Sequence, residues 1–301
     1  MLFRGPYGWG EFSPFADYSV QQDSHWLEAA IEAAFSPLNF PTDASIAVNA
    51  IIGDVEDCNM ATQQAIDFYG CRTIKLKVGL DADSDLQRVH HVAEHLSNAF
   101  PEEPIGVRID ANGRWSLNQA TDFLKEIANL PIEYVEQPCQ SVAELTQLRR
   151  RVTVPIAVDE SIRIDRLDSV KECADIAILK VSPLGGLAAT TRMAERIGVP
   201  VRISGALETS VGLAPSLLAA HQLAPDAVAG LGTGMLFHTD LVAKSVVPVD
   251  GRIPVGRVEP DPALLENHAS LPEISNQWRE RVEAAFEFIA HPTRQLIDME
   301  G

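Results

Sequence analysis

Acidic residues recur in the middle of the chain, each placed directly after a short apolar run. Asp110, Glu136 and Asp159, here called the acid cluster, end three successive runs of this kind. Neighbouring strands of a parallel sheet lie about 5 Å apart, so acids at consecutive strand ends would converge. Each acid alone could equally cap the helix that follows it. Three converging carboxylates need a cation to stay ionised away from water, and hard oxygen ligands favour Mg²⁺, with Mn²⁺ as the alternative.

Three lysines in similar runs could supply a base. Lys75 and Lys77 are two residues apart, so in a strand both side chains face the same side. Two ammonium groups about 7 Å apart, close to a dication, are expected to lower each other's pKa, and a lysine lowered toward neutrality can act as a base. Lys180 ends the otherwise apolar run 176–179, where surface exposure is the simpler alternative. The strand order places Lys77 and Lys180 on opposite sides of the acid cluster, so a substrate could lie between them.

Polar residues beside the acid cluster are expected to support it. Arg108 and Asn112 flank Asp110 at a spacing of two residues, which points all three to the same side of a strand. Arg108 could orient a carboxylate or order the metal site, and Asn112 could contact the groups around the metal. Further supporting positions stand at later strand ends, namely Glu160, Ser204 and Gly205.

The elements that must position these residues form a repeat. Successive strand-end residues lie roughly 20–30 residues apart, which is the length of a strand, a crossover helix and two loops. An earlier strand fits 45–52, and an eighth strand would end near 230–234. About eight such units fit between residues 45 and 244. The pattern predicts an α/β protein with a closed (β/α)₈-type, TIM-like barrel in preference to an open sheet.

Helix start and stop signals lie between the strands. Ser116 with Gln119 forms a capping-box pattern before a helix expected over 117–130, and Ser141 with Glu144 repeats that pattern. A further helix is expected over 187–197 with Gly198 at its C-terminus.

The two ends of the chain do not follow the repeat. Residues 1–44 are expected to form the N-terminal part of a small α+β capping domain, and residues 245–301 a C-terminal segment that packs with it near the barrel mouth. The tail contains a helical pattern in which one face carries Trp278, Val282, Phe286 and Ile289.

Composition excludes several classes of protein. The formal net charge is −18, and so acidic a surface repels phosphate backbones, so nucleic-acid binding is not expected. No apolar stretch approaches the roughly 18 residues of a membrane helix, so no membrane partner and a cytoplasmic location are expected. The four cysteines form no CxxC pair and are interpreted as free thiols. The sequence indicates no oligomeric state.

Five short motifs, in their order and spacing, resemble the enolase superfamily and, within it, the muconate-lactonising subgroup. The resemblance spans about residues 5 to 260, and it implies a barrel enzyme that binds one Mg²⁺ and removes the proton next to a substrate carboxylate. The motifs are Lys75-Leu76-Lys77, Asp110-Ala111-Asn112, Val135-Glu136-Gln137-Pro138, Asp159-Glu160-Ser161 and Lys180.

The resemblance also implies a role for each matching residue. The acid cluster would bind Mg²⁺. Lys77 would be the acid/base and Lys75 its electrostatic neighbour. Lys180 would stabilise an enediolate from the opposite face.

The segment 8–15 and Arg108 are most similar to members that dehydrate 2-succinyl-6-hydroxy-2,4-cyclohexadiene-1-carboxylate, so this small carboxylate is the substrate that the resemblance implies. Members of the family have further cap strands before that segment, whereas only residues 1–7 precede it here. The resemblance therefore implies a misassigned start, a lost N-terminal stretch or a shortened cap. The segment 204–206 carries no histidine, which argues against the mandelate-racemase branch. N-acylamino-acid racemase, dipeptide epimerase and cycloisomerase activities are the alternatives within the superfamily. A non-catalytic barrel that serves as a binding protein is an alternative of a different class.

Overall fold

A parallel sheet of seven strands forms the centre of the molecule. The structure is a computed structural model that describes residues 1–54, 57–163 and 170–291. The strand order is β10-β9-β8-β7-β6-β5-β4, so sequential strands are neighbours throughout. The strands are β4 (Ala50–Ile52), β5 (Thr73–Lys77), β6 (Gly106–Asp110), β7 (Ile132–Glu136), β8 (Ile156–Val158), β9 (Ile176–Leu179) and β10 (Val201–Ile203).

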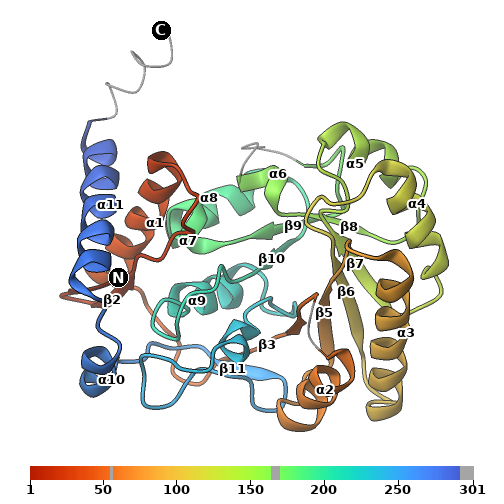
Figure 1. Cartoon of the computed structure of the whole chain (residues 1–301), viewed down its shortest axis with the longest axis horizontal. Helices are drawn as coiled ribbons and strands as arrows, with labels where there is room; N and C mark the ends of the chain where they lie inside the picture. The colour runs from red at the N-terminus through yellow and green to blue at the C-terminus, as the bar shows by residue number, and fades with distance from the viewer. Residues whose placement is uncertain (55–56, 164–169, 292–301) are drawn as a thin grey trace, which may run out of the picture.

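Helices connect these strands and cover the outer face of the sheet (Figure 1). Ser116 and Gln119 form the expected capping box at the start of α4, but this helix ends at Glu126 rather than near residue 130. The predicted C-terminus at Gly198 is confirmed, since this glycine has a left-handed φ of 83° after α8. The helices are α2 (Cys58–Gln63) with the π-helix η1 (Gln64–Phe68), α3 (Ala82–Ala99), α4 (Leu117–Glu126), α5 (Val142–Arg149), α6 (Glu160–Arg163), α7 (Val181–Leu184), α8 (Leu187–Ile197) and α9 (Ala214–Leu223).

Alternation along the strands separates the core from the site. Ile74, Leu76, Val107 and Ile109 belong to the main hydrophobic core, which lies between the sheet and the helices. The residues between them face the other side of the sheet, because successive side chains in a strand point in opposite directions. A second, small cluster fills part of that inner side and consists of Tyr134, Ala157, Ile176 and Ile178.

The two edges of the sheet differ from the prediction. Residues 45–52 form two strands rather than one: β3 (Ser45–Ala47) pairs antiparallel with β11 (Arg252–Pro254), and only β4 joins the parallel sheet. The expected eighth strand is reduced to isolated parallel bridges from Val48 to Ala229 and from Ser204 to Gly230, followed by the 3₁₀-helix η2 (Gly232–Leu236).

Close packing accounts for the short pairing at this edge. A Cβ atom added to Gly230 would lie 2.6 Å from Ser204 Oγ, so only glycine fits between the two edges here. Glycine is a weak strand former, and the pairing therefore stops after single residues.

A layer built from both ends of the chain lies on one side of the parallel sheet and its helices (Figure 1). This terminal layer comprises β1 (Leu2–Gly5), β2 (Gly8–Glu11), α1 (Val20–Phe35) and α11 (Pro272–Ala290), while the short α10 (Pro262–Asn267) precedes α11. Helix α1 contacts both β2 and α11. Gly5 and Gly10 lie against the carbonyl groups of Ala34 and Ala30, where any Cβ atom would collide with the helix backbone.

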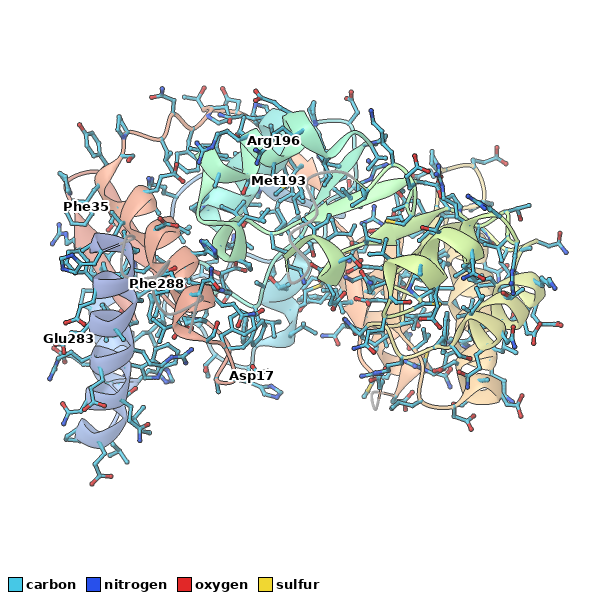
Figure 2. All side chains as sticks on the ribbon, turned by 90° about the horizontal axis from the view of Figure 1, so that it is seen from above. Asp17, Phe35, Met193, Arg196, Glu283 and Phe288 are labelled. Carbon is cyan, nitrogen blue, oxygen red and sulfur yellow. The ribbon has the colours of Figure 1, made fainter. Side chains whose placement is uncertain are left out.

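An apolar cluster holds the terminal layer together (Figure 2 shows α1 and α11 side by side). Phe12 and Trp26 are buried with Ala285, and Trp278, Val282 and Ile289 pack against them. The prediction that Phe286 shares this face is wrong, since its exposed fraction is 57%. Ala285 lies on the buried face instead of Phe286. Trp278, Val282, Ala285 and Ile289 are spaced by four, three and four residues, which keeps them closer to one helix face than a set that includes Phe286.

Two carboxylates join the terminal layer to the segments that follow β9 and β10, and their contacts are here called the junction. Glu11 is buried and accepts hydrogen bonds from the backbone N–H groups of Thr209 (3.1 Å) and Gly212 (3.1 Å) and from the Thr209 hydroxyl. Glu32 of α1 is half-buried and accepts from the backbone N–H groups of Leu187 and of Ala188 (3.0 Å) at the start of α8. The junction therefore holds the loop after β10 and the start of α8.

Two further predictions concern membrane-spanning helices and the cysteines. In the part of the chain that the structure describes, no helix is long and apolar enough to cross a bilayer. All four cysteines are free, as predicted: Cys58, Cys71, Cys139 and Cys173.

Candidate active site

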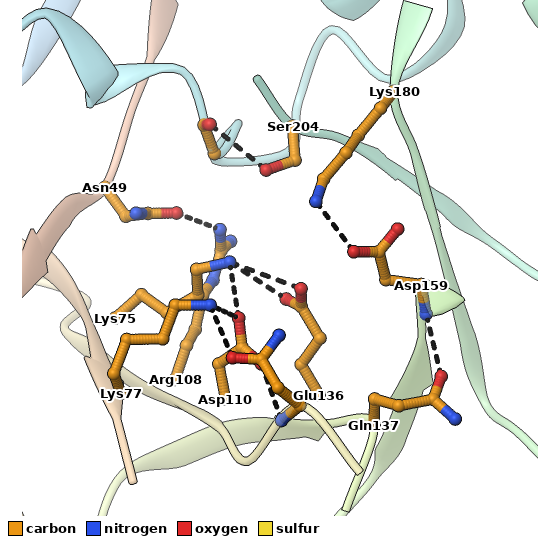
Figure 3. Close-up of polar contacts among 12 residues, drawn as sticks. Asn49, Lys75, Lys77, Arg108, Asp110, Glu136, Gln137, Asp159, Lys180 and Ser204 are labelled. Atoms are coloured by element: carbon orange, nitrogen blue, oxygen red, sulfur yellow. Dashed lines mark hydrogen bonds and ion pairs between the residues drawn. The ribbon is translucent and has the colours of Figure 1, made fainter. Parts of the chain in front are cut away.

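The acid cluster lies at the carboxyl ends of three adjacent strands. Asp110 and Glu136 are paired neighbours in the register of β6 and β7, and Asp159 directly follows β8. All three are 1% exposed. Figure 3 shows the three carboxylates directed toward a common space. The structure thus brings together the acids that the sequence singled out.

Three ammonium groups face these carboxylates. Lys75 Nζ lies 3.2 Å from Asp110 Oδ2 and 3.2 Å from Glu136 Oε2. Lys77 Nζ lies 2.6 Å from the same Asp110 oxygen, and its side chain is 29% exposed against 6% for Lys75. Lys77 is therefore the more accessible of the pair from solvent.

The third lysine approaches from the other side. Lys180 Nζ lies 2.7 Å from Asp159 Oδ2. In Figure 3 its side chain extends toward the acid cluster from the side opposite Lys75 and Lys77. The three lysines therefore flank a common space from two directions, as predicted from the strand order.

The charges in the site shift one another's pKa values. Burial acts to lower the pKa of Lys75, but Glu136 and Asp110 outweigh it and raise that pKa well above its usual value. Burial likewise opposes ionisation of Asp110, yet Lys75 and Lys77 hold its pKa well below the usual range. Burial and the charge of Asp110 raise the pKa of Glu136 to about 7 against the lowering effect of Lys75. For Lys180, burial acts to lower the pKa, but Asp159 and Glu136 raise it overall.

The carboxylates dominate the pKa of Lys75. The sequence predicts that neighbouring lysines beside a dication lower each other's pKa, whereas the carboxylates around Lys75 raise its pKa overall. Two carboxylates within 3.2 Å of its ammonium group outweigh the more distant neighbouring lysine.

Two residues that follow the acids have left-handed backbones. Asn112 has a φ of 46° and Gln137 a φ of 40°, an uncommon conformation that often marks functional sites. Asn112 Oδ1 accepts a hydrogen bond from Lys77 Nζ (2.9 Å), and its Nδ2 donates to Glu160 Oε1 (3.0 Å). Of the predicted supporting residues, Asn112 thus contacts Lys77 directly, and Glu160 contacts Asn112.

Gln137 is a supporting residue that the sequence analysis missed. Its Oε1 accepts from the backbone N–H groups of Asp159 (3.2 Å) and Ser161 (3.3 Å), and its Nε2 donates to Ser161 Oγ (2.9 Å). It therefore fixes the backbone that carries the third acid. Its place directly after Glu136 in the motif was the available signal.

Glu208 and Glu11 were also missed. Glu208 is buried, accepts from the Ser182 hydroxyl (2.9 Å) and from Ala206 N–H (2.7 Å), and so ties α7 to the loop after β10. Burial raises the pKa of Glu208, and the nearby Glu11 adds to that shift. A glutamate inside an otherwise apolar and small-residue segment was the available signal.

Arg108 lies in the interior of the sheet and binds groups other than the acid cluster. It donates from Nε to Glu133 Oε2 (2.7 Å), from Nη1 to Asn49 Oδ1 (2.7 Å) and from Nη2 to the Val228 carbonyl (2.8 Å). Its guanidinium also stacks over the Tyr134 ring at 4.9 Å. These contacts connect β6 with β7, with Asn49 and with Val228 just before the isolated bridges. Arg108 therefore holds the inner side of the sheet together.

Ser204 and Gly205 lie beside the site at the end of β10. Ser204 donates to the Gly230 carbonyl (3.2 Å), as Figure 3 shows. Gly205 packs against Thr233 and Glu208, so a side chain there would meet both.

The donor set fits a hard divalent cation. Among the described residues no three His, Cys, Asp or Glu side chains form a ready group of metal ligands, because ammonium groups lie between the acids. The carboxylates nonetheless stand on three adjacent strand ends, nearly without solvent, and positive charge already compensates them. Buried carboxylate oxygens that gather positive charge in this way are the ligands that Mg²⁺ prefers.

The fold and the site together define the family. Residues 58–261 match the enolase C-terminal domain-like family, and residues 1–34 match the enolase N-terminal domain-like family. The chain therefore belongs to the enolase superfamily, as the motifs predicted.

Individual relatives sharpen this assignment. The chain is 43% identical to an o-succinylbenzoate synthase of Mycobacterium tuberculosis, over 96% of this chain and 88% of the relative. It is 42% identical to the enzyme of the same name from Mycobacterium leprae, over 96% of this chain and 86% of that relative.

Solved structures with a similar fold include muconate lactonizing enzymes. The enzyme from Pseudomonas fluorescens, in complex with muconolactone, matches with a TM-score of 0.69 and 22% identity over 83% of this chain and 74% of the other. The enzyme from Pseudomonas putida matches with a TM-score of 0.66 and 23% identity over 81% of this chain and 75% of the other. A parallel sheet of seven strands with an enolase-like, TIM-like arrangement and a capping layer agrees with these neighbours.

Proposed function

We propose that the protein is a lyase of menaquinone biosynthesis that dehydrates 2-succinyl-6-hydroxy-2,4-cyclohexadiene-1-carboxylate to o-succinylbenzoate. The observation that carries the proposal is the approach of Lys77 and Lys180 to one buried acid cluster from two sides. The mycobacterial relatives that carry the name of this activity cover nearly the whole chain, which supports the same substrate.

Asp110, Glu136 and Asp159 would hold Mg²⁺, with Mn²⁺ as the alternative. When bound, the ion supplies positive charge to the substrate carboxylate as negative charge develops on it. Gln137 holds the backbone of Asp159 through two N–H groups, which keeps the third acid in place.

Lys77 acts as the acid/base. As the free amine, its Nζ takes the proton from the carbon next to the substrate carboxylate. The ring hydroxyl then leaves from the same face, and the same Nζ returns the proton to it as water forms. The C–O bond breaks, the ring becomes aromatic, and no further reactant is needed.

Two other lysines contribute charge rather than proton transfer. Lys180 holds its ammonium group on the opposite face, where it stabilises the enediolate. Lys75 is almost fully buried against Asp110 and Glu136, so it keeps the carboxylates compensated and does not meet the substrate proton.

The proposal extends to the architecture. We place a closed barrel at residues 45–244, with residues 1–44 and 245–301 forming the cap. The parallel bridges at Ala229 and Gly230 support closure, and the contacts between α1 and α11 support a cap built from both ends.

A second candidate is an N-acylamino-acid racemase. Lysines on opposite faces of a site suit a reaction in which a proton leaves one face and returns to the other. In a racemase both Lys77 and Lys180 must transfer protons, whereas the dehydration needs only the charge of Lys180. Lys180→Arg, which keeps the charge but is a poor base, should therefore retain dehydration more readily than racemisation.

Product analysis decides between the two candidates. The purified protein with Mg²⁺ is given the cyclohexadiene substrate and, separately, a panel of N-acylamino acids. We expect o-succinylbenzoate as the main product. Racemisation of the panel without dehydration of the cyclohexadiene would reject the proposed function in favour of the second candidate.

A further inference from the structure

A chain of three side chains connects Lys77 to the helix that follows Asp159. Lys77 Nζ donates to Asn112 Oδ1 at 2.9 Å, and Asn112 Nδ2 donates to Glu160 Oε1 at 3.0 Å. The three residues come from the end of β5, the loop after β6 and the first turn of α6. Each is partly buried. This relay lies beside the acid cluster and contacts it at Asp110.

The chemistry of the three groups fixes the direction of the relay. An ionised carboxylate only accepts hydrogen bonds and an ammonium group only donates, whereas an amide does one at each end. Glu160 therefore orients the Asn112 amide with its NH₂ group toward α6. The carbonyl oxygen of that amide is then left facing Lys77.

The backbone of Asn112 contributes to the same geometry. Its left-handed φ of 46° is a conformation that asparagine tolerates better than most residues. Its N–H donates to Asp110 Oδ1 at 3.2 Å, which directs the side chain back toward the site. The position of the amide is thus set from its backbone and from its far end.

We infer that Glu160 is a positioning residue for the acid/base lysine and acts through Asn112. The importance of Lys77 rests on the proposed function. Lys77 is the more exposed of the two β5 lysines, and Asp110 is its other hydrogen-bond acceptor among the described residues. The relay gives this long side chain a second acceptor and so one direction. Misplacement of a reacting group by about 1 Å costs on the order of 10²-fold in rate.

The first test is Glu160→Gln. Glutamine both donates and accepts, so it no longer dictates which end of the Asn112 amide faces Lys77. We expect kcat to fall about 10- to 100-fold while KM stays within about twofold, because positioning affects the reaction more than substrate binding. Mg²⁺ affinity measured by calorimetry should stay unchanged, since the acid cluster is intact. Glu144→Gln at the start of α5 is the matched control and should alter none of these values.

The second test reverses the relay. Asn112→Asp alone places two carboxylates against each other and should lower kcat further than Glu160→Gln. The double variant, which combines Asn112→Asp with Glu160→Gln, has the same total charge as the wild type. In it the introduced glutamine can donate to the introduced aspartate, which still offers Lys77 an acceptor. We expect the double variant to recover most of the activity lost in the worse single variant. A double variant no better than that single variant, or full kcat in Glu160→Gln, would overturn the inference.

A spectroscopic measurement separates this inference from the proposed function. In protein labelled with ¹⁵N-asparagine, the side-chain NH₂ signals of Asn112 are assigned by their loss in Asn112→Asp. We expect slow solvent exchange of the Asn112 amide proton that is hydrogen-bonded to Glu160. In Glu160→Gln this proton should exchange faster and its signal should shift. If the wild type yields no o-succinylbenzoate, the proposed function fails while this signal still tests the relay. If Asn112 exchanges equally fast in both proteins, the relay itself is wrong.

Discussion

Carboxylates that are largely shielded from solvent occur in two regions of this molecule. Lysine side chains surround them in one region, and backbone N–H groups donate to them in the other. At the carboxyl ends of the parallel strands, here called the mouth, the acid cluster faces the ammonium groups of Lys75, Lys77 and Lys180. At the junction, Glu11 and Glu32 face mainly backbone N–H groups. Backbone donors cannot move away or change charge, whereas lysine side chains can do both. The partners at the mouth therefore suit carboxylates that are proposed to bind a cation near the substrate, whereas the partners at the junction suit carboxylates that hold the structure.

The largest effect expected from this difference is at the mouth. Lys77→Ala should lower dehydration by at least about 10³-fold, because it removes the group that we propose as the acid/base. The free energy of unfolding should change little, since Lys75 still compensates Asp110. Activity assays and urea unfolding measure the two quantities, with Lys125→Ala on the exposed end of α4 as the control. Robust turnover by Lys77→Ala would show that another residue is the base.

Metal removal is the next test of the mouth. EDTA should abolish activity, and Mg²⁺ should restore it. Glu136→Gln should lose activity by removing one ligand charge. Above pH 7, however, it should be no less stable than the wild type. Burial raises the pKa of Glu136 to about 7, so above that pH the folded wild type must hold a buried charge at a cost that the neutral glutamine does not have. Full turnover in a verified metal-free preparation would contradict the metal assignment.

Substitution at the junction should reverse this pattern. Glu11→Gln keeps the size of the side chain but replaces one acceptor oxygen with a donor that faces a backbone N–H group. We expect the free energy of unfolding to fall by about 1–3 kcal/mol, the cost of leaving a buried polar group unpaired. Loosening of the loop after β10 should raise KM more than it lowers kcat. Asp17→Asn at the exposed turn before α1 is the control, and equal stability of both variants would mean that Glu11 does not hold the layer.

The smallest effect concerns the pH dependence of stability. Burial raises the pKa of Glu208 above its unfolded value near 4.5, so the folded state binds the proton more tightly than the unfolded state. Stability is then fully present below that unfolded value and is lost as pH rises through the higher folded value. Glu208→Gln carries no titrating group and should show a flatter fall in melting temperature between acidic and neutral pH. An identical slope in wild type and variant would place the pH dependence elsewhere.

The sequence predicted the acids and lysines because strand geometry alone decides where they point. Polar residues at period-two spacing near strand ends share one face, and sequential strands are neighbours here, so Asp110, Glu136 and Lys77 converge without further information. The same reasoning placed Arg108 correctly on the inner face. It could not identify Glu133 as the partner, because the register of β6 and β7 shifts between Val107 and Arg108.

Other features depend on distances that a sequence does not contain. The raised pKa of Lys75 follows from two carboxylates at 3.2 Å rather than from the neighbouring lysine. The division of 45–52 into two strands follows from pairing with β11, about 200 residues later in the chain. Ala285 rather than Phe286 is buried because α11 packs on α1, and the size of a side chain does not decide which face is covered.

The terminal layer also has a consequence for synthesis on the ribosome. Arg281 of α11 pairs with Asp23 of α1, 258 residues earlier. The strands that carry the acid cluster, by contrast, are neighbours both in sequence and in space. The strands of the parallel sheet can therefore assemble while the chain is still growing, since domains form as their residues emerge. Phe12 and Trp26 stay without their α11 partners until α11 itself has been made, so these residues complete their packing only after the strands of the sheet have emerged.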